Sequence, residues 1–388
     1  MVRSCVGFPH AGCSKPPRPI RFRRIRFGGE KIIASDGFPT SPAQVGAAWL
    51  SVALRAADLL GDGEVTAVEW QPIGTGQVGD SARFTLTYDR PGAGPATLAG
   101  KFPAEDATSR QTAVTHGLYA KEVSFYRELA GELAIRTPRP LATEVSDDGG
   151  AFVLLFEDLG PARGGNQLAG CGLADAREAV RQLAGLHAPS LGNTAMTGRP
   201  WLAARPGSLE ALSQAYPYAT QVFAERYAGQ LAPDLMAVCL GLSDRIDSWF
   251  GRTIARPCLV HGDYRLDNML FDIKGGAEPL GVLDWQTLTV GSGLTDLAYF
   301  NGAGVGTTLA AHEDELIDLY LSAMAASGVF LTRAEVWDDY RRGVLHGVST
   351  AVFSAAFVER TERGDAMFLD MARGACQLAL KHDSLGAL

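Results

Sequence analysis

The sequence has few features that could build a zinc site, a disulfide network or a membrane segment. Its six cysteines are scattered over 388 residues and form no C-x-x-C pair. This distribution is typical of reduced, mostly buried thiols, so we expect a cytoplasmic protein without zinc. No apolar run approaches the ~20 residues that a membrane-spanning helix needs, so we expect no membrane span.

Several catalytic motifs are also absent. The sequence has no G-x-x-x-x-G-K-[ST], which excludes a P-loop enzyme, and no G-x-S-x-G nucleophile elbow. The segment "HEDEL" at His312 lacks the second histidine of a zinc protease motif. The chemistry must therefore be sought elsewhere.

The formal net charge is −8, which argues against a nucleic-acid partner bound through a global positive field. The exception is the start of the chain, where residues 1–31 hold eight Lys or Arg residues and one acid. This stretch has no long apolar core, so it is not a secretory signal. Because Pro16, Pro17 and Pro19 break any helix, we predict that residues 1–37 form a disordered extension; a transit peptide and a nucleic-acid-binding arm are the alternatives.

The remainder of the chain divides into two parts by its periodicity. Residues 41–60 predict a capped helix with Pro42 in its first turn, and strand-like runs follow at 64–73, 82–89 and 96–103. An amphipathic helix is expected near 117–133 and a buried strand near 151–159. After Gly160 the pattern is mostly helical. The sequence thus predicts an α+β fold with a small lobe at 38–157, a hinge, and a helical lobe at 158–388.

The most specific stretch is "LVHGDYRLDNMLF". It places His261, Asp263 and Asn268 in the spacing H-x-D-x-x-x-x-N of a kinase catalytic loop. In that chemistry an aspartate orients the attacking hydroxyl, and an asparagine nearby reaches a magnesium ion, which prefers oxygen ligands. Sixteen residues later, Asp284 ends an apolar strand, where a kinase has its second metal-binding carboxylate.

Together with "VLDWQ" and "TDLAYF", this stretch resembles the aminoglycoside phosphotransferase/choline kinase superfamily, and most closely its ecdysteroid-kinase-like bacterial branch. The resemblance extends from about Phe38 to the C-terminus. It implies a bilobal protein-kinase-like fold with ATP and Mg²⁺ as cofactors. By position in the motifs, Asp263 would be the catalytic base, Asn268 and Asp284 would bind Mg²⁺, and His261 and Asp296 would be structural. Arg265 would either neutralise charge on the transferred phosphoryl group or pair with Asp267.

The small lobe should supply a lysine for the α- and β-phosphates and a glutamate to hold it. Lys101 ends an apolar strand, and Glu122 lies on the apolar face of the following helix. An unpaired charge at either position would be costly, which favours the pair. The hinge "FVLLFEDLG" would bind adenine through the backbone between Phe156 and Asp158. The nearby Gly165-Asn166-Gln167 departs from the Gly-Asp-Gln that the branch often has.

Gly74, Gly76 and Gly79 spell G-x-G-x-x-G, which suits a dinucleotide site or a kinase flap. A dinucleotide site needs a helix after the last glycine, whereas here an alternating strand follows. The context favours a flap whose backbone amides, with the Ser81 hydroxyl, reach the ATP phosphates.

We therefore expect an ATP- and Mg²⁺-dependent kinase of a small hydroxylated molecule. The alternatives are a protein kinase, a catalytically silent nucleotide- or metabolite-binding module and, on the glycines alone, an oxidoreductase. The acceptor stays open between aminoglycoside, choline-like, steroid-like and hydroxyacyl compounds, with the branch favouring a hydrophobic one. Six carboxylates of the C-terminal helices would form either an acidic pocket for amines or a solvated face: Asp338, Asp339, Glu359, Glu362, Asp365 and Asp370. The sequence leaves the oligomeric state open.

Overall fold

The computed structural model describes residues 37–74, 79–305, 307 and 309–388. The chain divides into two units, residues 1–37 and 38–388. The basic segment, apart from its last residue, lies outside the described residues, and so does Gly76. Among the described residues, no helix is long and apolar enough to cross a bilayer.

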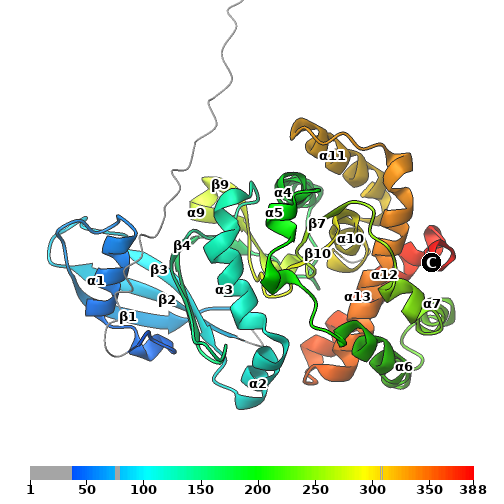
Figure 1. The fold of residues 1–388 in the computed structure, drawn as a ribbon, viewed down its shortest axis with the longest axis horizontal. Coiled ribbons are helices and arrows are strands. Elements are labelled where there is room, and N and C mark those ends of the chain that lie inside the picture. Colours follow the sequence, from blue (N-terminus) through cyan, green and yellow to red (C-terminus); the bar gives the residue numbers. More distant parts are fainter. Residues whose placement is uncertain (1–36, 75–78, 306, 308) are drawn as a thin grey trace, which may run out of the picture. The chain divides into compact units, whose positions relative to one another are not determined.

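The N-terminal part of the second unit is a five-stranded antiparallel sheet (Figure 1). Its strands lie in the order β1-β2-β3-β5-β4: β1 Val65–Pro72, β2 Gly79–Tyr88, β3 Thr97–Pro103, β5 Phe152–Glu157 and β4 Pro140–Val145. Strand β5 is apolar at nearly every position because side chains alternate between two cores. Phe152, Leu154 and Phe156 join the larger core, whereas Val153 and Leu155 join the smaller one.

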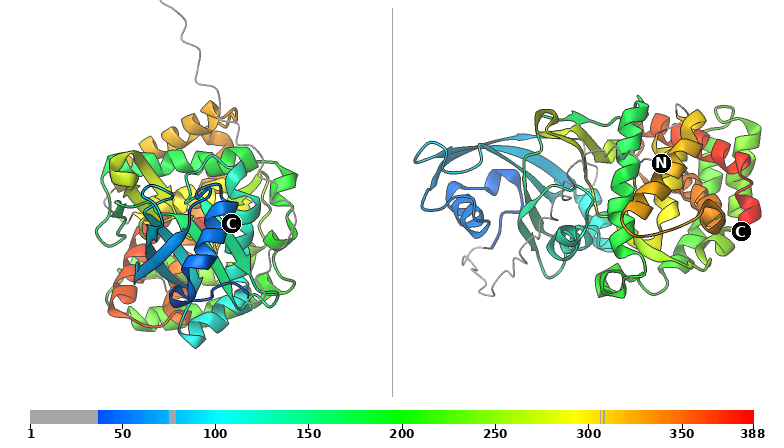
Figure 2. Two further views of the ribbon diagram at one scale, coloured as in Figure 1. Left: turned by 90° about the vertical axis from the view of Figure 1, so that its left-hand side faces the viewer. Right: turned by 90° about the horizontal axis from the view of Figure 1, so that it is seen from above.

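The helices of this lobe are α1 (Ala47–Ala56), α2 (Ala107–His116) and α3 (Leu118–Glu128). Helix α1 packs against the sheet and completes the smaller core (Figure 2). The prediction that this helix begins near Ser41 is wrong. Pro42–Gln44 form a separate 3-10 turn, and the helix starts only after Gly46, because Val45 and Gly46 have extended backbone angles.

The C-terminal lobe is mainly helical (Figure 1). Its longer helices are α4 Leu173–Ser190, α6 Ser208–Arg226, α7 Pro233–Ser243, α10 Gly293–Tyr299, α11 Glu313–Ala326, α12 Arg333–Phe357 and α13 Glu362–Lys381. Its shorter helices are α5 Thr194–Thr197, α8 Ile246–Phe250 and α9 Ile273–Gly276. Strands β7 (Pro257–Val260) and β10 (Thr289–Ser292) form one small sheet, and β6 (Arg163–Gly164), β8 (Met269–Asp272) and β9 (Glu278–Val282) form another.

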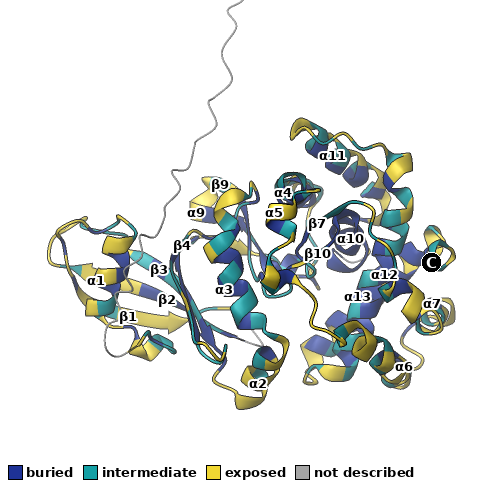
Figure 3. Ribbon diagram, in the orientation of Figure 1, coloured by how far each residue is buried: buried dark blue, intermediate teal, exposed yellow. Residues whose placement is uncertain are grey.

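The two lobes share the larger core. Helix α3 contributes Val123 and Phe125 to it, and the ring of Phe125 stacks on Trp285 with the ring centroids 4.0 Å apart. Helix α10 is buried along its whole length and lies at the centre of the helical lobe (Figure 3). The site residues between β7 and α10 are therefore held by a packed interior.

Candidate active site

The predicted catalytic loop joins β7 to β8, and Asp296 of α10 holds its backbone. The buried Asp296 carboxylate accepts the backbone N–H groups of His261 (2.7 Å) and Gly262 (3.0 Å). The His261 ring contacts the Leu283 carbonyl oxygen through Nε2 at 3.0 Å. Gly262 has φ +81°, and a Cβ there would meet the Thr287 carbonyl at 2.9 Å, so glycine is required. His261 and Asp296 thus occupy positions that orient the loop.

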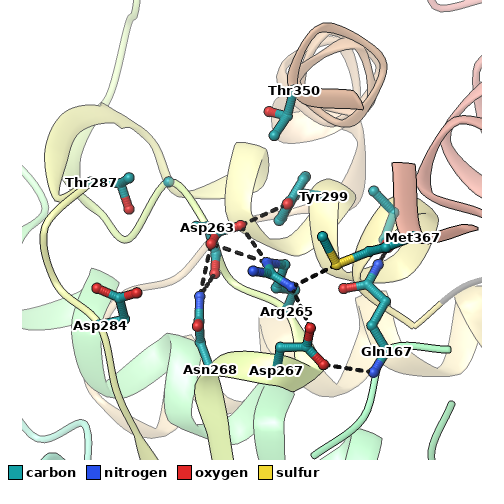
Figure 4. Close-up of polar contacts among 12 residues, drawn as sticks. Gln167, Asp263, Arg265, Asp267, Asn268, Asp284, Thr287, Tyr299, Thr350 and Met367 are labelled. Carbon is teal, nitrogen blue, oxygen red and sulfur yellow. Dashed lines mark hydrogen bonds and ion pairs between the residues drawn. The ribbon is translucent and has the colours of Figure 1, made fainter. Parts of the chain in front are cut away.

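Asp263 is held by three side chains (Figure 4). Its Oδ1 accepts hydrogen bonds from Arg265 Nε (2.9 Å) and the Tyr299 hydroxyl (2.8 Å), and its Oδ2 accepts one from Asn268 Nδ2 (2.9 Å). Burial raises the pKa of Asp263, but Arg265 and the Tyr299 hydrogen bond outweigh it, so the pKa lies below its ordinary value. Asp263 is therefore ionised at neutral pH and held in one orientation.

Arg265 lies between two carboxylates. It contacts Asp263 and also donates from Nη1 to Asp267 Oδ2 at 2.8 Å. Asp267 in turn accepts the Gln167 backbone N–H (3.0 Å) and an Arg363 guanidinium bond (2.8 Å). The structure thus contains the Asp267 pair that the sequence left as one alternative, and it also places the guanidinium on Asp263.

Lys101 and Glu122 come together as a pair. Lys101 Nζ lies 2.7 Å from Glu122 Oε2 and 3.0 Å from Asp284 Oδ1. The Glu122 side chain is only 2% exposed. Burial lowers the pKa of Lys101, but Asp284 and Glu122 together raise it above its ordinary value. The lysine is charged and links β3 to Asp284, which lies two residues after β9.

Asp284 has φ +62°, in the left-handed region that a residue with a side chain seldom adopts. Such a conformation persists only where the surroundings impose it, and it is common at functional sites. Here the next residue is fixed on both sides: the Trp285 backbone N–H donates to Glu122 Oε1 at 3.4 Å, and its ring stacks on Phe125.

The glycine segment joins β1 to β2 in the sequence. Gly74 has φ +74°, Gly79 begins β2, and Ser81 pairs with Lys101 across the sheet. Because a strand and not a helix follows Gly79, the segment does not have the architecture of a dinucleotide site. The flap role of Gly74, Gly79 and Ser81 stays a prediction, and Gly76 lies outside the described residues.

At the hinge, Phe156 is the last residue but one of β5 and contributes to the larger core. The Asp158 carboxylate pairs with Arg83 at 2.8 Å and accepts the Gly160 N–H at 2.8 Å. Asp158 thus caps the segment that follows, and adenine binding by the hinge backbone stays a prediction.

Asn268 and Asp284 fit a magnesium ion that is bound partly by the protein and partly by the phosphates of the substrate. Among the described residues, no group of three or more His, Cys, Asp or Glu side chains is arranged to hold a metal. Mg²⁺ in kinases needs only one or two protein carboxylates, because waters and substrate phosphates complete its shell. The Asn268 amide nitrogen donates to Asp263 Oδ2 and to the Asp263 carbonyl (2.9 Å each), so its oxygen is the amide atom left for a ligand.

Comparison with known proteins identifies the family. A model of the Phosphotransferase enzyme family (APH) matches residues 107–326, more than half of the chain. The chain belongs to this family. The predicted resemblance to the aminoglycoside phosphotransferase/choline kinase superfamily is confirmed, and so is the predicted enzyme class, a phosphotransferase with a hydroxyl acceptor.

Two solved structures align with most of the chain, and the first of them supports the fold. A protein from Ralstonia eutropha JMP134, provisionally described as an aminoglycoside phosphotransferase, aligns over 86% of this chain and 97% of its own, with 17% identity and a TM-score of 0.50. Choline kinase from Cryptosporidium parvum Iowa II covers 81% of this chain and 89% of its own, with 10% identity and a TM-score of 0.49. The predicted bilobal α+β fold is confirmed.

Curated relatives match only a short segment. "Acyl-CoA dehydrogenase family member 11" of Mus musculus is 39% identical over 62 residues, which is 15% of this chain and 8% of that protein. "Acyl-CoA dehydrogenase family member 10" of Mus musculus is 52% identical over 44 residues, 11% of this chain and 4% of that protein. The chain therefore spans less than a tenth of the length of these relatives.

The sequence analysis did not predict two residues that contact the candidate catalytic loop. Tyr299 reaches Asp263, and His346 on α12 contacts the Gly262 carbonyl oxygen through Nε2 at 2.8 Å. Tyr299 had a signal, since it lies three residues after Asp296 on one helix, and residues so spaced share a face. His346 had no such signal, because α12 is far from the loop in the sequence.

Three of the six carboxylates near the C-terminus form ion pairs with neighbouring arginines. Asp338 and Asp339 lie one turn before arginines of the same helix, and Asp365 of α13 lies beside an arginine at the helix start. The pairs are Asp338–Arg341 (3.2 Å), Asp339–Arg342 (3.3 Å) and Asp365–Arg360 (2.7 Å). The charge of these three carboxylates is compensated locally, Glu359 and Glu362 are exposed and Asp370 is half-buried. The three pairs and the two exposed glutamates favour the solvated-face alternative over an amine pocket.

Proposed function

We propose that this phosphotransferase is an ATP- and Mg²⁺-dependent kinase of a small molecule, transferring the γ-phosphoryl group to a hydroxyl. One observation carries the proposal. Lys101 Nζ joins Glu122 and Asp284, while Asn268 and Asp263 are hydrogen-bonded to each other. These contacts support the proposal, because a kinase uses a lysine held by a carboxylate and a base held beside a metal ligand.

In this mechanism the protein mainly positions groups and neutralises charge. The hydroxyl oxygen of the acceptor bonds to the γ-phosphorus, the bond to the β–γ bridging oxygen breaks, and ADP leaves. The ionised Asp263 orients the hydroxyl and accepts its proton, which then passes to solvent. Its lowered pKa keeps it ionised at neutral pH, so it is ready to accept that proton.

The remaining residues bind the nucleotide. Asn268 and Asp284 would hold Mg²⁺, which when bound screens the charge of the phosphates. Lys101 would contact the α- and β-phosphates. The flap at Gly74–Ser81 would cover the phosphates, and the hinge backbone between Phe156 and Asp158 would bind adenine. A binding module without turnover is the second candidate, but it needs no oriented Asp263.

The test is a mass-shift screen of a metabolite extract with Mg²⁺ and ATP. We expect a phosphorylated product with the wild-type protein, and a rate lower by about 10²- to 10⁴-fold with Asp263→Ala, because the oriented carboxylate is lost. Asp338→Ala, which removes an exposed carboxylate on α12, is the control and should retain activity.

Two outcomes would contradict the proposal in different ways. A product that persists with Asp263→Ala would refute the base. Binding of Mg²⁺ and ATP without any phosphorylated product would favour the binding module.

A further inference from the structure

Helix α12 has one stripe that is not fully buried. Between Gly343 and Ala355, the partly exposed residues are His346, Thr350, Phe353 and Ser354, and the others are buried. Their spacing of four, seven and eight residues from His346 places them on a single face of the helix. We call these four partly exposed residues the acceptor stripe.

The acceptor stripe begins at the catalytic loop. His346 contacts the carbonyl oxygen of Gly262, the residue before Asp263, and its ring centroid lies 5.2 Å from that of Tyr299. Figure 4 shows the next member, Thr350, on the same side of the loop as Tyr299 and Asp263. The partly exposed face of α12 is therefore continuous with the site where the hydroxyl would react.

The stripe ends in exposed aromatic rings. The Phe353 and Phe357 centroids are 6.0 Å apart, and Phe357 lies 6.2 Å from Tyr218 of α6. Tyr218 is 61% exposed and Phe357 is 58% exposed. With a rise of 1.5 Å per residue, Phe353 and Phe357 lie about 10 and 16 Å along the helix from His346.

We propose that these three rings bind the apolar part of the phosphoryl acceptor, so that the substrate is a hydroxylated molecule with an apolar portion about 10–16 Å long. The inference rests on the proposed function, because it takes Asp263 as the reaction centre. Aromatic rings exposed together are uncommon on a soluble protein and usually mark a binding surface.

The composition of the stripe distinguishes this acceptor from a polyamine. The stripe contains no carboxylate, and Asp339 of α12 and Asp365 of α13 are each paired with an arginine. A polycationic acceptor would leave its amines without counter-charges there. A quaternary ammonium group could rest on aromatic rings, and it is therefore tested as a rival.

The experiment compares butanol, octanol, dodecanol and choline as acceptors with Mg²⁺ and ATP, followed by ADP release and product mass. We expect kcat/KM to rise about three- to fourfold per methylene along the alcohols, because each buried methylene adds apolar contact. Phe357→Ala should lower kcat/KM about tenfold for dodecanol, whose extended chain reaches Phe357, and much less for octanol, with the KM for ATP unchanged.

Phe330→Ala is the matched control, because Phe330 is 81% exposed and precedes α12, away from the aromatic end of the stripe. It should behave as the wild type, and thermal melting of all variants should coincide. A flat alcohol series, a preference for choline, or equal behaviour of Phe357→Ala and Phe330→Ala would overturn the inference.

A second measurement separates this inference from the proposed function. Displacement of an anilinonaphthalene sulfonate dye by dodecanol reports binding without turnover. If no compound is phosphorylated but dodecanol displaces the dye from wild type and not from Phe357→Ala, the kinase proposal fails and the apolar site stands. If displacement is the same in both proteins, the apolar site fails regardless of activity.

Discussion

Replacing Tyr299 by phenylalanine tests how the structure sets the basicity of Asp263. The Tyr299 hydroxyl donates to Asp263 Oδ1 at 2.8 Å, and the ring is fully buried, so the substitution removes one hydrogen bond and little volume. A hydrogen bond to a charged group contributes roughly 1.5–3 kcal/mol. Because Arg265 and Asn268 remain as donors, we take the lower end, about one pKa unit, given ~1.36 kcal/mol per unit.

The pKa of Asp263 should therefore rise by about one unit in Tyr299→Phe. Since the base must be ionised, the acidic limb of the kcat/KM profile should move to higher pH by the same amount. The rate on the plateau should fall about three- to tenfold, because the carboxylate is less well oriented. Because the acidic limb of the wild type lies below the ordinary aspartate pKa of 3.8, initial rates of ADP release are measured from about pH 3 to 8, with enzyme stability checked at each pH.

Tyr340→Phe is the matched control. Tyr340 is also a buried phenol that donates to a carboxylate, Glu313 Oε1 at 2.7 Å, but it does not contact Asp263. It should leave the acidic limb in place even if it lowers the melting temperature. An acidic limb in Tyr299→Phe that coincides with the wild type would refute the reasoning, since Tyr299 would then not affect the proton affinity of Asp263.

Two further predictions concern buried charges. Glu122→Gln should lower the stability by about 2–3 kcal/mol in urea unfolding and raise the KM for ATP, because Lys101 loses one of its two partners; an unchanged KM would contradict the assigned role. Hydrogen bonds from His382, Lys381 and Tyr340 outweigh the burial of Glu313 and lower its pKa from 4.5 to about 2. This buried carboxylate (2% exposed) should add on the order of 3 kcal/mol above about pH 4.5, lost as the pH falls toward 2. Urea midpoints of wild type and Glu313→Gln should therefore differ at pH 7 and converge near pH 2; a constant difference would contradict this.

Local signals in the sequence predicted much of the site. The spacing of His261, Asp263 and Asn268 belongs to one short loop, so its chemistry can be read without knowing the fold. The strand that follows Gly79 excluded a dinucleotide site for the same reason. The predicted start of the first helix at Ser41 is wrong. The residues at Ser41 and Pro42 resemble a helix start, but the backbone is extended at Gly46, and the sequence does not reveal this.

The sequence by itself indicated the enzyme class through its family resemblance, and the two-lobe α+β organisation through its periodicity, while the catalytic roles that its short spacings suggest stay predictions. Only the tertiary structure decided what surrounds Asp263. Tyr299 is 36 residues away in the chain, and His346 is 84 residues from Gly262. The stripe from His346 to Phe357 was also hidden, since its partial exposure arises only when the rest of α12 is packed into the core. Periodicity shows which residues share a helix face, whereas packing decides what that face meets.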